Sequence, residues 1–471
     1  MPASIRLTRG IALALMGISC AAMAQVDPDA VAPVAVSTDD TSISPTSGVS
    51  STGGPATQLN YSVELGVEHS SNINQSQTDP IDQDLLIPRL YFTLDQVGST
   101  IQAHAVGQVE YRNYLQGDFS NEFRGQLAAA LNWVVAPQWL TFAVTENSSV
   151  EPVDTLANNS PTNVQQTNVF AAGPSLLLHF DNALRGQVDL RYINTTASET
   201  KYFDSQRGLG ALRLIRELNA TDQLSLNAET EHVDFQQSNQ IAGQFTPDYD
   251  SYNLYGRYQS KLAHVQIDAS LGWSRYNFGQ GVPDQSGSLA QARINWNFTP
   301  QNTFGLGVAR QFTDASEQLM VDPTQIGTNI DTTSITIGSA VVSPQIYLEK
   351  RIDANYDYED ARFSFSLAPY YQQLDYVGDP LYDQEGPGLS LSVQHLLTPL
   401  LTAGFAVGAE RIRYTAIDRN DDFYSFGPVV TDQLTPHWSW RLNLTHNRRS
   451  STAPGLSYTE NLAFFVLSYK R

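Results

Sequence analysis

The sequence predicts an all-β fold, a transmembrane antiparallel β-barrel of about 20 strands, with roughly 18 to 22 compatible with boundary errors of a few residues. Three observations predict it. Apolar and polar residues alternate over repeated stretches of ~10 residues. The connections between these stretches are alternately short and long, and the last stretch, Ala463 to Tyr469, alternates up to the C-terminus. Outer-membrane barrels usually close through such a terminal strand.

The N-terminus, residues 1–24, predicts a signal peptide. Arg6 and Arg9 precede an apolar run from Ile11 to Met23, and Ala22-Met23-Ala24 forms a small-residue cleavage site. The apolar run is shorter than the ~18 residues that a membrane-spanning helix needs. The mature chain is therefore expected to leave the cytoplasm, and cleavage would remove Cys20, the only cysteine.

Residues 25–58 are rich in Ser, Thr, Pro and acidic residues and show no sustained period. Such a composition buries too little apolar surface to fold alone. We expect a disordered acidic periplasmic leader there, followed by the barrel at residues 59–471.

From Leu59 onward the hydrophobic period becomes two. Leu59, Val63 and Val67 share one face, and Glu64 and Glu68 share the other. The stretch from Ile101 to Arg112 repeats the pattern clearly. Because a polar face cannot lie against lipid, the polar residues are expected to line an aqueous lumen.

The connections indicate how the barrel is oriented. The expected short ones are 97–99, 135–138, 181–182, 219–221, 299–302, 398–399 and 435–436, and the expected long ones are 71–84, 151–164, 194–205, 236–249, 277–287, 313–346, 376–387 and 448–457. Short periplasmic turns and long extracellular loops are typical of outer-membrane barrels. Both ends of the barrel chain then lie in the periplasm, which requires an even number of strands.

Aromatic residues agree with this orientation, because outer-membrane barrels carry an aromatic girdle at each membrane interface. The expected periplasmic girdle comprises residues beside short turns: Trp133, Trp139, Trp296, Phe298, Trp438 and Trp440. The expected outer girdle comprises residues near the loops: Tyr192, Tyr252, Tyr414 and Tyr424.

The net negative charge of the chain limits which molecules it can bind. The net charge is −21, with only 27 Lys and Arg residues, which argues against nucleic-acid binding. Most acidic residues fall between the alternating segments, where they would meet water or lipopolysaccharide with its divalent cations. The expected partners are outer-membrane lipid and lipopolysaccharide, with no nucleic acid.

Enzyme motifs are absent from the sequence: there is no Gly-x-Ser-x-Gly, no His-Glu-x-x-His and no glycine-rich phosphate loop. We therefore expect no catalytic residues, no metal site and no cofactor. His446, Asn447 and Ser450 lie within one segment, so a lipid-modifying enzyme is a distant alternative.

The polar face supplies the candidate lumen residues. Arg124, Arg185 and Arg191 could form a basic ladder that guides an anion, which Glu229 and Glu231 would oppose. A wall of mixed charge suits a hydrated neutral or weakly charged sugar chain better. The residues expected to line the lumen are His104, Glu110, Arg124, Arg185, Arg191, Glu229, Glu231 and Arg257, with Arg362 as a further inward position.

Three motifs carry a family resemblance. They are Gly66-Val67-Glu68-His69-Ser70-Ser71-Asn72-Ile73, Asn132-Trp133 with Pro137 and Leu140, and Glu349-Lys350-Arg351 leading into Tyr358-Glu359-Asp360-Ala361-Arg362. With them the chain, from about residue 59, resembles outer-membrane β-barrel porins associated with exopolysaccharide and PEP-CTERM loci of Gram-negative bacteria. Such barrels usually end in Phe, whereas here Tyr469 is followed by Lys470-Arg471.

The expected function is a porin-like channel in the outer membrane of a Gram-negative bacterium. The resemblance implies export of an extracellular polysaccharide, with polysaccharide-export components and the barrel-assembly machinery as partners. One alternative is a general diffusion porin in which a long loop, 313–346, folds inward as a constriction. Another is a non-conducting structural or assembly barrel with a plugged lumen.

Overall fold

The computed structural model describes residues 56–236, 248–279, 283–320 and 341–471. The predicted signal peptide lies outside the described residues, as does the predicted leader up to residue 55. The first strand begins at Ala56, three residues before the predicted start of the barrel.

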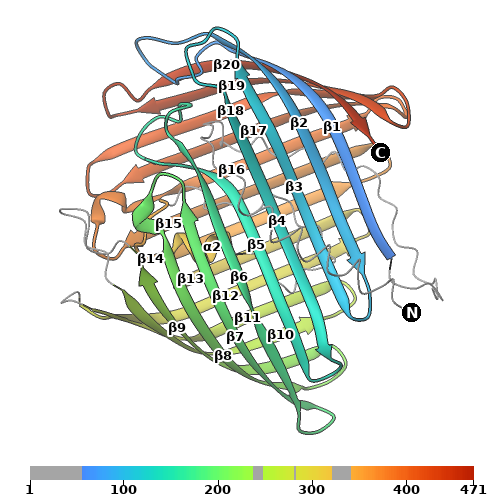
Figure 1. Ribbon diagram of the computed structural model, residues 1–471, viewed down its shortest axis with the longest axis vertical. Coiled ribbons are helices and arrows are strands. Elements are labelled where there is room, and N and C mark those ends of the chain that lie inside the picture. The colour runs from blue at the N-terminus through green and yellow to red at the C-terminus, as the bar shows by residue number, and fades with distance from the viewer. Residues whose placement is uncertain (1–55, 237–247, 280–282, 321–340) are drawn as a thin grey trace.

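The described chain forms a single closed antiparallel β-barrel of 20 strands, which confirms the predicted fold class (Figure 1). Each strand pairs with the next, and β1 also pairs with β20. The strands are β1 (Ala56–Ser70), β2 (Gln83–Val97), β3 (Ile101–Tyr114), β4 (Glu122–Ala136), β5 (Leu140–Pro152), β6 (Val164–His179), β7 (Leu184–Ala197), β8 (Ser205–Glu217), β9 (Asp222–Phe235), β10 (Tyr249–Lys261), β11 (Val265–Phe278), β12 (Gln285–Thr299), β13 (Asn302–Thr313), β14 (Tyr347–Glu359), β15 (Phe363–Tyr376), β16 (Gln384–Leu396), β17 (Leu401–Tyr414), β18 (Arg419–Gln433), β19 (Trp438–Ser451) and β20 (Tyr458–Lys470).

Three short helical segments lie in the described parts of the outer loops. They are η1 (Lys201–Phe203), α2 (Ala315–Leu319) and η4 (Pro380–Tyr382). Within the residues that the structure describes, no helix is long and apolar enough to cross a membrane.

The barrel closes where β20 meets β1. Tyr469 is the register partner of Val63, and the backbones of Tyr61 and Arg471 exchange hydrogen bonds of 3.0 and 3.2 Å. The pairing thus continues through the terminal basic residue. The departure from a terminal Phe leaves the closing ladder intact.

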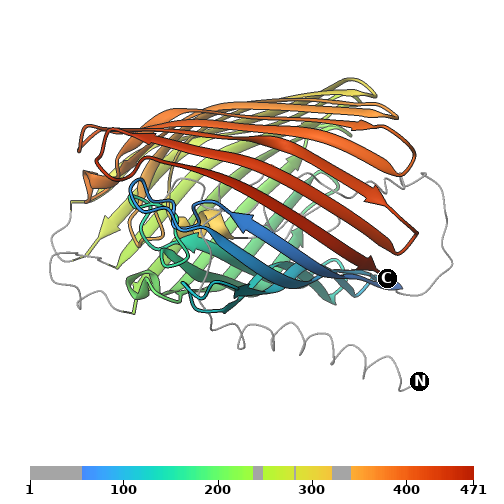
Figure 2. The same ribbon diagram turned by 90° about the horizontal axis from the view of Figure 1, so that it is seen from above.

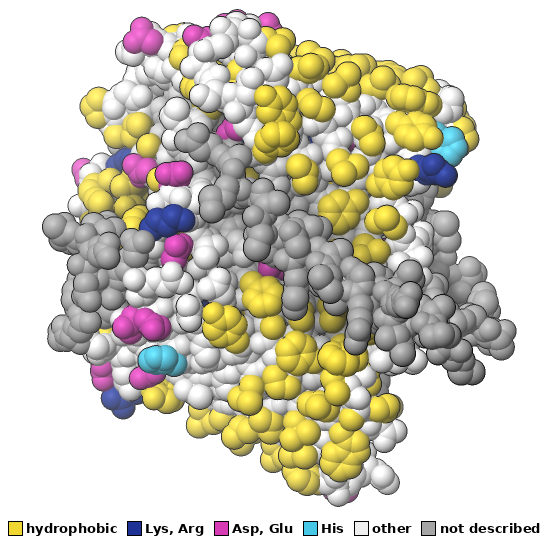
Figure 3. Space-filling model, viewed as in Figure 1, with side chains coloured by type: hydrophobic (Ala, Val, Ile, Leu, Met, Phe, Trp, Pro, Cys, Tyr) yellow, Lys and Arg dark blue, Asp and Glu magenta, His cyan; other side chains and the backbone are white. Residues whose placement is uncertain are grey.

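Side chains alternate between an apolar exterior and a polar interior, as the period of two predicts. On β1, Leu59 and Val63 are more than half exposed, whereas Glu68 keeps only 6% of its surface. Figure 3 shows hydrophobic side chains gathered over the outer surface of the strands. This is the surface that a hydrocarbon environment requires.

Five of the six residues expected in the periplasmic girdle are exposed, and Trp440 is half-buried. Trp133, Trp139, Trp296, Phe298 and Trp438 are all exposed near the short turns, and the Trp438 and Tyr469 rings lie 5.1 Å apart. Tyr192, Tyr252 and Tyr424 are exposed toward the loop side, as expected. The prediction that Tyr414 belongs to the outer girdle is wrong, because this residue is only 3% exposed. It lies inside, with the Arg419 guanidinium 4.8 Å from its ring.

The connections show the predicted asymmetry. At the periplasmic end each has two to four residues, and residues 262–264 and 360–362 form two further short turns. Arg362 lies in the second of these turns and not on the inner wall. Several strands extend farther outward than predicted, so the connections after β7 and β15 are shorter than expected.

We predict that Leu271→Arg lowers the free energy of unfolding by ~2–4 kcal/mol, because Leu271 faces outward at mid-strand, where lipid would surround the charge. Gln291→Arg on the inner face of β12 is the control and should cost much less. Denaturant unfolding in lipid vesicles measures both. Equal losses for the two variants would contradict the assignment of faces.

Candidate functional site: the lumen and its outer mouth

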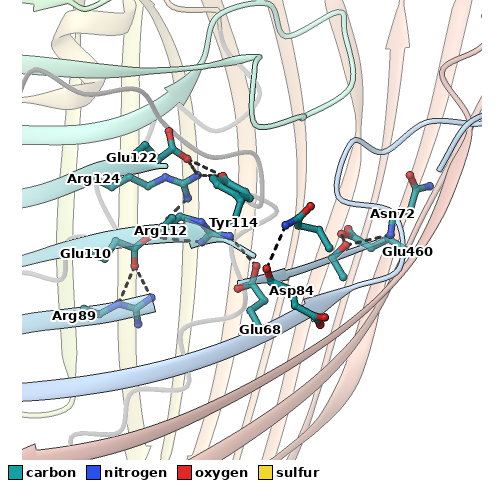
Figure 4. Close-up of polar contacts among 12 residues, drawn as sticks. Glu68, Asn72, Asp84, Arg89, Glu110, Arg112, Tyr114, Glu122, Arg124 and Glu460 are labelled. Atoms are coloured by element: carbon teal, nitrogen blue, oxygen red, sulfur yellow. Dashed lines mark hydrogen bonds and ion pairs between the residues drawn. The ribbon is translucent and has the colours of Figure 1, made fainter. Parts of the chain in front are cut away.

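Charged side chains on the inner face of β1 to β3 form a connected network (Figure 4). Glu110 accepts hydrogen bonds from Nε and Nη2 of Arg89 at 2.8 and 2.6 Å. Arg112 Nη2 donates to Glu68 Oε1 at 2.7 Å and Arg112 Nη1 lies 3.6 Å from Glu110. Charges buried this deeply are tolerated because each is paired.

The network continues to β4. Arg124 Nη2 donates to Glu122 Oε1 at 2.6 Å, and the Tyr114 hydroxyl donates to the same oxygen at 2.7 Å. Nearer the periplasm, His104 Nδ1 lies 2.6 Å from Asp95 Oδ1. The three predicted lumen residues of this wall, His104, Glu110 and Arg124, therefore each lie beside a side chain that can carry the opposite charge.

The predicted residues of β7 are paired as well. Arg191 Nη2 donates to Ser175 Oγ at 2.7 Å and lies 3.5 Å from Asp189. Arg185 Nη2 lies 3.1 Å from Glu217. Arg124, Arg185 and Arg191 thus each have a carboxylate neighbour, so the wall carries matched charges where a basic ladder was considered.

On β9 and β10, Glu229 accepts a hydrogen bond from the Tyr255 hydroxyl at 2.7 Å. Arg257 Nε donates to Asp268 at 2.8 Å. Glu231 lies 3.6 Å from Arg207 Nη1 on β8, a residue that the sequence analysis did not select.

Arg207 belongs to a cluster that holds the start of α2 against the inner wall, which we call the latch: Arg207, Tyr249, Asp314 and Ser316. Asp314 Oδ2 accepts from Arg207 Nη1 and from the Tyr249 hydroxyl, both at 2.7 Å. Arg207 Nη2 donates to Ser316 Oγ at 2.8 Å. Asp314 Oδ1 accepts from the Glu317 backbone N–H at 2.9 Å and so also caps α2.

Apolar contacts continue from α2 across the lumen, and Figure 2 shows α2 inside the ring of strands. The cluster joins inner residues of β6 and β7 to inner residues of β14 and β15, which lie eight positions farther round the barrel. We call it the mouth cluster; its buried members are Val169, Ala171, Ile193, Ala197, Phe203, Ala315, Leu319, Val341, Val342, Tyr347, Leu374 and Tyr376. The described residues of the connection between β13 and β14, at α2 and at Val341 and Val342, therefore bridge two distant walls.

A second outer loop, residues 153–163, is also tied across the mouth. Arg449 Nη1 on β19 donates to Asn158 Oδ1 at 2.8 Å, and Arg449 Nη2 donates to Asp421 at 2.8 Å. Asn158 Nδ2 donates in turn to the Gln75 carbonyl at 2.6 Å. Two loops thus narrow the outer end of the lumen.

The inner arginines that contact the outer loops are less exposed than two arginines elsewhere on the inner wall. The side chains of Arg207 and Arg449 keep 2% and 3% of their surface, whereas those of Arg213 and Arg293 keep 34% and 58%. Arginines beside the outer loops are therefore nearly closed off from solvent, whereas Arg213 and Arg293 keep exposed surface.

Glu317 follows the latch on α2. Burial raises its pKa well above its usual range, and the nearby carboxylates of Asp314 and Glu231 add to the rise. The closed arrangement therefore favours the protonated form of Glu317.

Sequence reasoning did not select Arg207, Tyr249 or Asp314. One local signal was present: Asp314-Ala315-Ser316-Glu317 has a cap residue followed three positions later by Glu, a helix-start pattern. Among the described residues, no group of three or more His, Cys, Asp or Glu side chains could hold a metal ion.

Comparisons with known proteins find no matching family model and no matching curated protein. Among solved structures, the ferric enterobactin receptor PfeA of Pseudomonas aeruginosa, as a point mutant in complex with enterobactin, is similar at a TM-score of 0.46 and 8% identity, with 89% of this chain and 82% of that chain covered. The FrpB iron transporter of Neisseria meningitidis has a TM-score of 0.42 and 10% identity, with 88% and 82% covered.

We predict that Arg207→Ala releases α2 from the wall, because it leaves Asp314 without its charged partner. In a Cys20→Ser background, Leu319→Cys should react with a thiol reagent at least about tenfold faster after Arg207→Ala, since local opening governs access to a buried group. Ser274→Cys, buried on β11, is the control for general unfolding. An unchanged rate at position 319 would contradict the latch.

We also predict that closure depends on pH through Glu317. Because the closed state raises its pKa, that state binds the proton more tightly, so closure strengthens as pH falls from the raised pKa toward the ordinary value of about 4.3. Ion conductance in a planar bilayer should fall over this window. The Glu317→Gln variant should stay closed above this pH window, and its conductance should no longer depend on pH. A pH response like that of the wild type in this variant would contradict the role of Glu317.

Proposed function

We propose that this protein is an outer-membrane channel whose outer mouth is held closed by the latch. One arrangement carries the proposal: a polar lumen of matched charges is crossed at its outer mouth by α2. The Arg207–Asp314 ion pair holds α2 to one wall, and the mouth cluster joins it to the other. A purely structural barrel would have no need of exposed inner charges such as Arg293.

The dimensions support passage of a solute. Barrels of about 16–18 strands already leave an aqueous channel, and this barrel has 20 strands. Inner charges pair with one another, so the wall offers water many hydrogen-bonding partners without a strong field of either sign. Such a wall favours a hydrated neutral or weakly charged solute over a single ion.

We propose an extracellular polysaccharide as the solute and export as its direction. The wall chemistry supports a sugar chain, and the family resemblance of the sequence supports the export role. Polysaccharide-export components and the barrel-assembly machinery are the corresponding partners, with lipid and lipopolysaccharide around the outer surface. In this account the latch keeps the membrane sealed when no chain is passing.

A general diffusion porin is the second candidate. The inward position of α2 favours it, because a loop folded inside a barrel limits the size of what can pass. In that case the latch would be a permanent constriction and would not open.

The test is single-channel conductance of the refolded protein, with wild type and Asp314→Asn compared. We expect low conductance for wild type and a severalfold increase for Asp314→Asn, because the uncharged amide binds Arg207 more weakly. Polysaccharide fragments should then block the open variant. Open conductance that ignores the fragments would favour the diffusion porin, and no conductance in either protein would contradict the channel.

A further inference from the structure

A recess of about 530 Å³ lies on the inner wall between β12 and β15. Arg293 and Asn295 of β12, Arg351, Asp353 and Asn355 of β14 and Tyr370 of β15 line it. Its size is within the range of about 300–1,000 Å³ typical of small-molecule sites.

Two glycines of β13 make room for the recess. Gly307 and Gly305 are the register partners of Asp353 and Asn355. A Cβ at position 307 would lie 2.7 Å from the Asp353 carboxylate oxygens, and one at position 305 would lie 1.9 Å from Asn355 Oδ1. The side chains of Asp353 and Asn355 therefore lie over the two glycines of β13, and a larger residue at either glycine position would displace them.

The lining places hydrogen-bond donors directly beside acceptors. Asp353 has Arg293 Nη2 at 3.5 Å on one side and Arg351 Nε at 3.3 Å on the other. The Arg351 guanidinium is positioned by the Tyr370 ring, whose centroid is 4.7 Å away, and by Gln372 Oε1 at 3.1 Å. The Arg293 side chain is 58% exposed, which leaves donors directed to the lumen.

This arrangement selects for hydroxyl groups. A guanidinium only donates hydrogen bonds and a carboxylate only accepts them, whereas a hydroxyl does both. Neighbouring hydroxyls of a sugar ring can therefore bridge Arg293 and Asp353, and the Asn295 amide offers a donor and an acceptor beside them.

The charges around the recess favour a neutral ligand. Arg293 and Arg351 face Asp353 within it, and two further carboxylates border it: Asp357, which accepts from Asn355 Nδ2 at 2.6 Å, and Glu410, which accepts from the Tyr370 hydroxyl at 2.7 Å. An anionic sugar would meet no excess of positive charge there.

We propose that this recess is a subsite for a short segment of a neutral oligosaccharide. The proposal rests on the proposed function, since it names the chemistry and the place by which a passing chain is held in the lumen. It is tested by binding, which does not require conduction.

The experiment is isothermal titration calorimetry of the full-length barrel in detergent, with a neutral hexasaccharide of glucose and with hexagalacturonate as probes. We expect the neutral probe to bind, and Arg293→Ala to weaken it about tenfold, equivalent to about 1.4 kcal/mol. Arg275→Ala is the matched control, because Arg275 is similarly exposed, lies 3.1 Å from the Asp284 carboxylate and does not line the recess. It should leave the dissociation constant within about twofold.

Three results would overturn the subsite: no binding of the neutral probe, tighter binding of hexagalacturonate, or equal effects of the two arginine variants. Conductance of the same preparations separates the two proposals. Conduction without oligosaccharide binding would leave the channel in place and remove the subsite. Binding without conduction, even in Asp314→Asn, would leave a sugar-binding barrel and contradict the channel.

Discussion

The pairing of β20 with β1 is the constraint on which the rest of the structure depends. In hydrocarbon every backbone N–H and C=O must find a partner within the protein, and only a closed barrel meets this requirement with strands. The hydrogen bonds between Tyr61 and Arg471 complete the ladder at the periplasmic end. Once the ring is closed, the period of two fixes which side chains meet lipid and which meet the lumen.

Closure of a wide ring creates an interior that must be polar and yet cannot carry unpaired charge in its narrow parts. The structure meets this requirement in two ways. Farther from the outer loops, inner charges such as Arg293 keep exposed surface and lie beside a carboxylate, here Asp353. At the outer mouth, where the loops exclude water, the buried Arg207 and Asp314 are paired and further bonded to Tyr249 and Ser316. The same ion pair thus satisfies two buried charges and positions α2 against the inner wall.

Much of the fold was predictable from the sequence, because alternation depends only on neighbouring residues. It predicted a barrel of about 20 strands and identified the strand that closes it. The prediction for Tyr414 was wrong because it relied on the position of this residue next to a loop. The alternation of inner and outer residues, continued from the exposed Phe405, puts position 414 on the inner face. The latch was not predictable, since Arg207 and Asp314 lie 107 residues apart and only the assembled barrel brings them together.

The most direct test of the central claim is a charge-swap cycle at the latch, read as single-channel conductance. Arg207→Asp and Asp314→Arg should each give an open channel, because each single change places two like charges together in a buried site. The double variant should return to low conductance, since it restores an opposite pair at the same positions. Equal conductance in all four proteins, or a double variant as open as the singles, would contradict closure of the mouth by this pair.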